Sequence, residues 1–159
     1  MNKRREFFSV KRAGVAALAA LLVLLTLPVL AGEVVFTKRG KAINGYDPVA
    51  YFTQGKPAKG KTDFTHKWMG STWRFASAAN RDAFAAAPEK YAPQYGGYCA
   101  WAVSQGYTAP TDPDAWKIVG GKLYLNYSKG IQQRWASSAA KLIIDGDENW
   151  PGIKSKLAN

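Results

Sequence analysis

One pattern of residues occurs twice in the chain: an apolar strand, a glycine turn, a second strand, a serine and then a helical segment. Gly70 precedes Ser77 by seven residues, and Gly121 precedes Ser128 by the same seven. Glycine at such a turn favours a β-hairpin, and serine is a preferred helix N-cap. Aromatic residues recur at matching positions, three and fourteen residues after each glycine: Trp73 and Phe84, then Tyr124 and Trp135.

This repetition has two interpretations. The two stretches match either because all strand–turn–strand–helix units look alike, or because two such units pack together around one shared aromatic core, which small units need. Asp47-Pro48-Val49-Ala50-Tyr51 also resembles Asp112-Pro113-Asp114-Ala115-Trp116, at a different distance from its hairpin. The predicted fold is α+β, a small single domain of two β-hairpin–helix units with additional helices.

Local patterns predict the individual elements. Apolar and polar residues alternate in half-buried strands, and serine caps and prolines bound helices. The predicted strands are residues 64–68, 72–75, 116–119 and 122–126. The predicted helices are residues 77–87, 98 up to Gly106, a helix capped by Ser128 and a last one that ends at 142–144. Residues 49–52 are a strand or a helical turn, and 45–48, 88–91 and 145–147 are turns.

Residues 1–31 have the features of an export signal. Five basic residues precede an uncharged run from Ala13 to Gly32, and Val29-Leu30-Ala31 offers a cleavage site. Arg4-Arg5 resembles the twin-arginine motif, although the leucine-rich run suits ordinary secretion equally well. We predict a signal peptide (1–31), a linker (32–43), a domain (44–151) and a tail (152–159) in a periplasmic or secreted protein. The alternative is an inner-membrane anchor at residues 13–30, since about twenty apolar residues span a bilayer.

Charge and rare residues narrow the possible partners. The net charge is +11, and removing residues 1–31, with five of the 22 basic and one of the 11 acidic residues, leaves +7. Basic residues among aromatic ones can mark a nucleic-acid surface, but export argues against that partner. A solvated face, or attraction to anionic lipid or an acidic protein, fits better. One cysteine excludes an intramolecular disulfide, and one histidine excludes a multi-histidine metal cage.

A longer pattern carries a family resemblance. Residues 45–52, 64–75, 77–84 and 88–91 together resemble the YHS domain, a small module associated with heavy-metal enzymes and transporters. Residues 44–151 are similar to exported bacterial YHS-domain proteins, which carry the segment Tyr-Gly-Gly-Tyr-Cys-Ala found here at 95–100. The resemblance implies a small ββα-type fold and a role in metal handling.

The resemblance also identifies two departures that concern metal binding. In the metal-associated form of the domain, one cysteine follows Asp-Pro-Val and another follows the aromatic strand that ends in Phe. Here those positions are Ala50 and Ala76. Copper and zinc prefer thiolate or imidazole ligands at a soft metal site. Only His66 and Cys99 remain as such donors, so they are the candidate metal ligands.

His66 and Cys99 each have two interpretations. His66 lies between Phe64 and Trp68 in a predicted strand and shares their side, as a hydrogen-bonded core or rim residue or as a metal ligand or proton acceptor. Cys99 follows Gly96-Gly97 at a predicted helix start, as a small buried residue or as an activated thiolate.

If His66 and Cys99 converge, two chemistries become possible. The pair could hold one copper or zinc ion with Asp47, Tyr46 or a water. Alternatively, His66 could activate Cys99 as a nucleophile while Asn126 or Asp47 orients the ring. The sequence has none of the local motifs of cysteine hydrolases, so we assign no catalytic residue.

A third function needs no such chemistry. The chain has more aromatic residues than a small domain must bury, and some could line a groove for a partner or an apolar ligand. These residues are Tyr46, Tyr51, Trp68, Trp73, Tyr95, Tyr98, Trp101 and Trp116. The leading prediction is an exported YHS-domain protein that binds copper or zinc through His66 and Cys99, with Tyr46, Asp47 and Tyr98 as ligand-binding candidates. The alternatives are an interaction module for a periplasmic protein or ligand, and a thiol-dependent enzyme. We expect no nucleic-acid partner, and membrane contact only through an uncleaved N-terminal segment.

Overall fold

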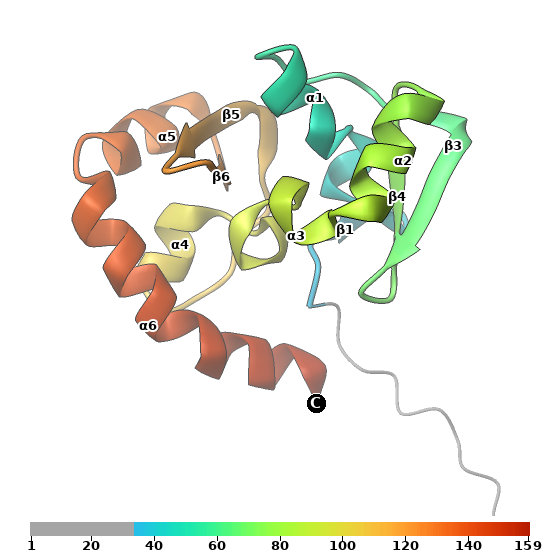
Figure 1. Ribbon diagram of the computed structural model, residues 1–159. Helices are drawn as coiled ribbons and strands as arrows, with labels where there is room; N and C mark the ends of the chain where they lie inside the picture. The colour runs from blue at the N-terminus through green and yellow to red at the C-terminus, as the bar shows by residue number, and fades with distance from the viewer. Residues whose placement is uncertain (1–33) are drawn as a thin grey trace, which may run out of the picture.

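The computed structural model describes residues 34–159, which form two hairpin-based halves lying side by side (Figure 1). A four-stranded sheet in the order β1-β2-β4-β3 belongs to the first half, and a two-stranded sheet of β5 and β6 to the second. The strands are β1 (Thr37–Lys38), β2 (Lys41–Ala42), β3 (Lys61–Trp68), β4 (Ser71–Phe75), β5 (Asp112–Val119) and β6 (Lys122–Asn126). Strands β2 and β4 pair in parallel, and the other pairs are antiparallel. The predicted α+β class is confirmed.

Each hairpin is followed by a serine-capped helix, as predicted. The side chain of Ser77 accepts a hydrogen bond from the backbone N–H of Asn80 (3.2 Å) at the start of α2 (Ala78–Ala86). Ser128 accepts one from the N–H of Ile131 (3.3 Å) at the start of α5 (Lys129–Ala136). These bonds satisfy an N–H group that a helix start otherwise leaves unpaired.

The second half repeats the first beyond this shared pattern. In each half a 3-10 helix, η1 (Ile43–Gly45) or η2 (Gln94–Gly97), precedes the hairpin and is followed by a short α-helix, α1 (Pro48–Thr53) or α4 (Ala100–Ser104). The strand register also shifts at matching places in the two hairpins. The shift lies between Lys61 and Thr65 in the first and between Asp112 and Trp116 in the second, nine and five residues before Gly70 and Gly121. A hairpin followed by a helix requires neither the shift nor the 3-10 helix. The structure therefore supports two related units.

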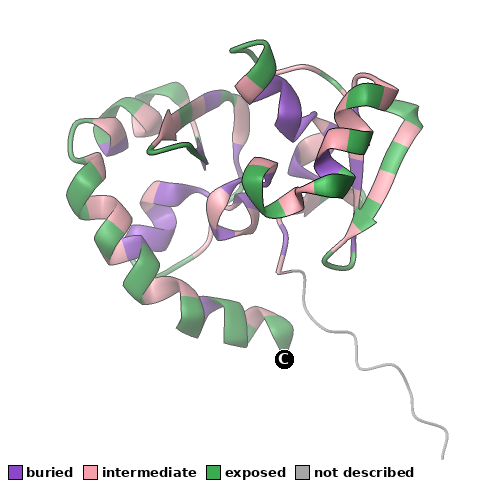
Figure 2. Cartoon of the chain, in the orientation of Figure 1, coloured by how far each residue is buried: buried purple, intermediate pink, exposed green. Residues whose placement is uncertain are grey.

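The core consists of two clusters rather than the single shared core that one of the two interpretations of the repeat implied. Strand β6 explains the division, because side chains alternate across a strand. Leu123 and Leu125 pack into the first cluster with Trp73 and Phe84, whereas Tyr124 packs into the second with Trp135. Figure 2 shows buried segments in both halves. The hairpin β5–β6 of the second half thus contributes side chains to both clusters.

The predicted linker is part of the fold from residue 34 on. Strands β1 and β2 lie in this segment, and β2 pairs with β4 through Lys41 and Thr72. Val35 and Ala42 are buried in the first cluster. The predicted signal peptide (1–31) and the alternative anchor (13–30) lie outside the described residues.

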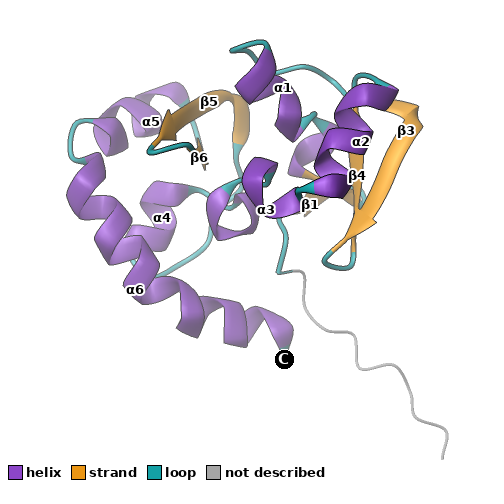
Figure 3. Cartoon of the chain, in the orientation of Figure 1, coloured by secondary structure: helices purple, strands orange, loops and turns teal. Residues whose placement is uncertain are grey.

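Two further helices complete the fold (Figure 3). Helix α3 (Pro88–Tyr91) connects the halves where a turn was predicted, and α6 (Ala139–Ala158) runs through the predicted turn at 145–147. Gly146 lies inside this helix rather than at its end. Because glycine has no side chain, α6 packs directly against Tyr95 at this position. The predicted tail is therefore helical, and Ile153 is buried. Within residues 34–159, no helix combines the length and the hydropathy needed to cross a bilayer.

Candidate functional site

Cys99 lies just before α4 and is fully buried. Its sulfur donates a hydrogen bond to Oδ1 of Asn126 (3.7 Å) and accepts one from the backbone N–H of Tyr127 (3.3 Å). The thiol is therefore satisfied both as a donor and as an acceptor.

Asn126 connects this cysteine to α4. It ends β6, is fully buried, and its Oδ1 also accepts a hydrogen bond from the N–H of Trp101 (3.2 Å). Sequence reasoning placed Asn126 beside an imidazole, whereas the structure places it beside the thiol and the first turn of α4. Its Nδ2 has no hydrogen-bond partner among the described residues.

A pocket of about 230 Å³ lies against Cys99. Its lining consists of Cys99, Trp101, Ala102, Tyr107, Ala109, Tyr127 and Ile131, none of which is charged. Trp101 and Tyr107 meet edge to face, with ring centroids 6.3 Å apart, and Tyr107 and Tyr127 are about half exposed. We call this space the Cys99 pocket. The sequence indicated Trp101 and Cys99 but gave no signal for Tyr107, Tyr127 or Ile131, which only the fold brings there.

His66 lies in the other half of the molecule. It shares the inner face of β3 with Phe64 and Trp68, as predicted, and its ring meets that of Phe84 edge-on at 6.1 Å. Figure 1 shows β3 at the opposite side of the fold from α4. His66 in β3 and Cys99 beside α4 belong to different units, and the structure does not bring them together.

Asp47 holds the first unit together. It is fully buried and caps α1: its Oδ1 accepts from the N–H groups of Val49 (2.8 Å) and Ala50 (3.3 Å). Its Oδ2 accepts from the N–H of Ala76 (2.9 Å) and from Nδ2 of Asn80 (2.6 Å). The fold thus brings together the two positions at which the metal-associated form of the domain has cysteines.

The residues at this position do not fit a soft metal ion. Alanine offers no ligand atom, and both oxygens of the Asp47 carboxylate are already occupied by protein donors. Copper and zinc would require sulfur or imidazole donors. Nor do any three His, Cys, Asp or Glu side chains of residues 34–159 form a group able to hold a metal ion.

Cys99 occupies in the second unit the position that Asp47 occupies in the first. Asp47 N–H donates to the carbonyl of Ala58 (2.9 Å), and Cys99 N–H donates to that of Ala109 (3.0 Å). In the first unit, the N–H of Ala76, six residues after Gly70, donates to the Asp47 side chain. In the second unit, the N–H of Tyr127, six residues after Gly121, donates to the Cys99 sulfur. The structural counterpart of Asp47 is therefore Cys99 and not Asp112, which the sequence comparison suggested.

The two units differ in how this position is filled. In the first, Nδ2 of Asn80 lies 2.6 Å from the Asp47 carboxylate. The residue at the matching place in α5 is Ile131, which cannot donate a hydrogen bond to Cys99 and lines the pocket instead. An interaction that closes the first unit is thus replaced by an apolar cavity in the second.

The other two predicted ligand-binding residues lie elsewhere. Tyr46 forms an isolated β-bridge with Lys59. Tyr98, its counterpart in the second unit, packs its ring against Phe36 (5.7 Å) and Trp150 (6.4 Å). Neither residue lines the Cys99 pocket.

Three of the predicted groove aromatics do line a common cavity. Trp68, Trp73 and Tyr95 line a groove of about 330 Å³ where the two halves meet. We call it the junction groove; its other lining residues are Val34, Met69, Glu89, Ala92, Pro93, Gln94, Gly96, Lys122, Trp150 and Lys154. None of these ten residues was predicted from the sequence to line a groove; Lys122 comes from the second hairpin, and Trp150 and Lys154 come from α6.

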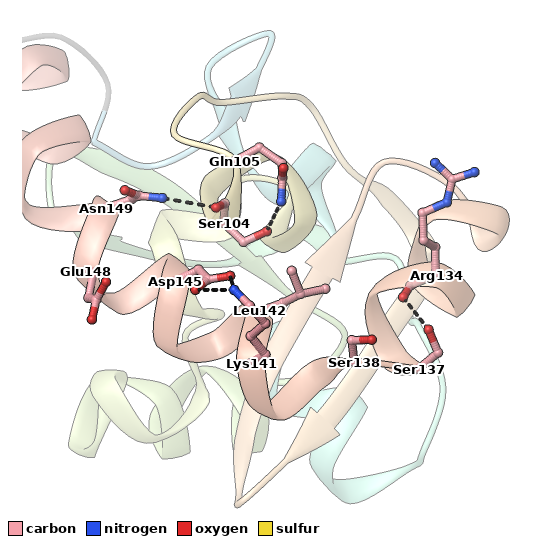
Figure 4. A pocket seen from close by; sticks show the side chains of 10 residues that line it. All are labelled: Ser104, Gln105, Arg134, Ser137, Ser138, Lys141, Leu142, Asp145, Glu148 and Asn149. Atoms are coloured by element: carbon pink, nitrogen blue, oxygen red, sulfur yellow. Dashed lines mark hydrogen bonds and ion pairs between the residues drawn. The ribbon is translucent and has the colours of Figure 1, made fainter.

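A larger polar cavity of about 590 Å³ lies along α4, α5 and α6 (Figure 4). Its polar groups mostly bind one another: Lys141 pairs with Asp145 (2.6 Å), and Nε2 of Gln105 donates to Oγ of Ser104 (3.1 Å). Nδ2 of Asn149 donates to the carbonyl of Ser104 (3.1 Å). These internal pairs leave it a weaker candidate for ligand recognition than the two aromatic cavities.

Comparison with known proteins gives one match. Residues 49–95 match the family model of the YHS domain. No curated protein and no solved structure matches the chain. The matched segment covers α1, the first hairpin, α2 and α3, so the Cys99 pocket lies in the second unit, outside it.

Proposed function

Because residues 49–95 form a YHS domain that is followed by a second, related unit, we propose that the chain is a non-catalytic binding protein whose second unit takes a small uncharged apolar ligand. One observation carries this proposal: the Cys99 pocket is apolar, has no charged lining residue and opens at the surface between aromatic side chains. Export through residues 1–31 remains a prediction and would make this a periplasmic or secreted binding protein.

The size of the pocket indicates the size of the ligand. A cavity of roughly 150 Å³ lined by apolar side chains accommodates benzene, so about 230 Å³ accommodates one substituted aromatic ring. Burying roughly 200 Å² of such a ring contributes about 5 kcal/mol. The loss of translational and rotational freedom on association offsets part of this gain, so we expect a Kd in the millimolar range. Trp101 and Tyr107 supply ring edges and faces for the contact.

The surroundings of the thiol support binding over catalysis. A nucleophilic cysteine is commonly activated by a base within hydrogen-bond reach, whereas the partners of the Cys99 sulfur are an amide oxygen and a backbone N–H. His66, the base suggested by the sequence, lies in the other unit. The same separation argues against one metal ion held by both residues.

The sole cysteine provides the test. We expect indole or toluene to slow the alkylation of Cys99 by N-ethylmaleimide in the full-length chain, with saturation at millimolar concentration. Ile131→Phe, which fills the pocket, should abolish this protection. Ile144→Phe, at an exposed position of α6, is the matched control and should retain it.

Two results would overturn the proposal. One is the absence of saturable protection by any neutral ring in the wild-type protein. The other is stoichiometric copper or zinc in the purified protein that is lost in both Cys99→Ser and His66→Gln, which would establish the metal function instead.

A further inference from the structure

The junction groove has lysine side chains in its lining, whereas the Cys99 pocket has no charged residue. Lys122 and Lys154 both line it and both are exposed. Among residues 34–159, neither ammonium group forms an ion pair: the two ion pairs there are Arg81–Asp82 and Lys141–Asp145. Two unpaired cations therefore lie beside a cavity whose walls are aromatic.

The walls of the groove are held by contacts within the protein. Nε1 of Trp73 donates to the carbonyl of Trp68 (3.1 Å), and the two rings lie 5.8 Å apart. The hydroxyl of Tyr95 donates to Oδ1 of Asp147 (2.9 Å), and its ring lies 5.9 Å from that of Trp150. Side chains locked in this way bind a ligand without first paying the cost of being ordered.

We infer that the junction groove is a second binding site, for an aromatic ring that carries a carboxylate. Its volume of about 330 Å³ accommodates one or two fused rings. The partly exposed rings of Trp68 and Trp150, which pack on the buried Trp73 and Tyr95, contact the ligand ring, and Lys122 and Lys154 attract its negative charge. With Glu89, the one acidic residue of the lining, the two lysines leave the groove with a net charge of +1, which suits a ligand with a single negative charge. The YHS domain contributes Trp68, Trp73 and Tyr95, whereas the lysines come from the second unit and α6, so the site requires both halves.

The test compares two isosteric probes, 2-naphthoate and the neutral 2-naphthamide, titrated into the full-length protein by calorimetry. We expect the carboxylate to bind about three- to tenfold more tightly than the amide, because partly exposed ion pairs contribute modestly. The double variant Lys122→Gln/Lys154→Gln should bind both probes equally. Lys117→Gln/Lys156→Gln, which changes two exposed lysines outside the groove, should preserve the preference.

Equal affinities of the wild type for the two probes would overturn the inference, and so would a preference that persists without Lys122 and Lys154. Ile131→Phe separates this site from the Cys99 pocket. If that variant lost naphthoate binding, the probe would be in the Cys99 pocket, and the junction groove would not be its site. If it kept naphthoate binding but lost protection by indole, both sites would be supported separately.

Discussion

Replacing Gly146 by alanine tests the contact that joins α6 to the rest of the fold. In a helix interior this change ordinarily stabilises by up to about 1 kcal/mol, since glycine is a poor helix former. Here a Cβ atom at position 146 would lie 2.6 Å from the hydroxyl oxygen of Tyr95 and 2.8 Å from its Cζ. Tyr95 is buried and bonded to Asp147, so its ring has little freedom to move.

The expected result is a net loss of stability. Overpacking costs about 1–3 kcal/mol, and weakening the hydrogen bond to Asp147 adds about 1.5 kcal/mol. After subtraction of the helix-propensity gain, we expect Gly146→Ala to lower the free energy of unfolding by about 2 kcal/mol, measured by urea denaturation. In the background of Tyr95→Phe, which removes the nearer contact atom, the same substitution should cost less.

Gly152→Ala is the matched control in the same helix. A Cβ atom at position 152 would meet nothing within 4 Å, so this substitution should be neutral or stabilise by up to about 1 kcal/mol. If Gly146→Ala stabilised the protein as much as Gly152→Ala, Tyr95 would not pack against α6, and the wall of the junction groove would be placed differently.

Three further predictions concern single residues. Asp47→Ala removes the acceptor of four hydrogen bonds and should lower the free energy of unfolding by about 3 kcal/mol in urea; exposed Asp63→Ala should change it by less than about 0.5 kcal/mol, and equal effects would contradict the role of Asp47. Gly96→Ala should lower the melting temperature more than Gly106→Ala, because both have positive φ but only at Gly96 would a Cβ atom collide with the N-terminal backbone. Burial, followed by the hydrogen bond to its carboxylate partner, raises the pKa of Tyr95 above its ordinary value of about 10. The unfolded chain therefore loses this proton first as pH rises, so the free energy of unfolding should fall above about pH 10. Tyr95→Phe should reduce that fall, as measured by urea unfolding across this pH range. An unchanged slope would count against the burial of the phenol.

Interactions between residues close in the chain could be predicted from the sequence. The hairpins at Gly70 and Gly121 and the helix caps at Ser77 and Ser128 depend on a few consecutive residues, and all four are present in the structure. The shared face of Phe64, His66 and Trp68 follows from the alternation of side chains along one strand.

Tertiary structure decided which of these local pieces meet. Asp112 matches Asp47 in neighbouring residue types, yet Cys99 takes its structural place, because the match depends on hydrogen bonds from distant backbone groups. Similarly, Gly146 resembles a turn residue until Tyr95, far away in the sequence, packs against it.

The sequence by itself determined two hairpin–helix units and a single thiol and imidazole. Only the tertiary structure placed that imidazole and that thiol in separate units and assembled the two aromatic cavities. The physical reason is that turns and caps depend on neighbouring residues, whereas a cavity depends on side chains that several distant segments bring together.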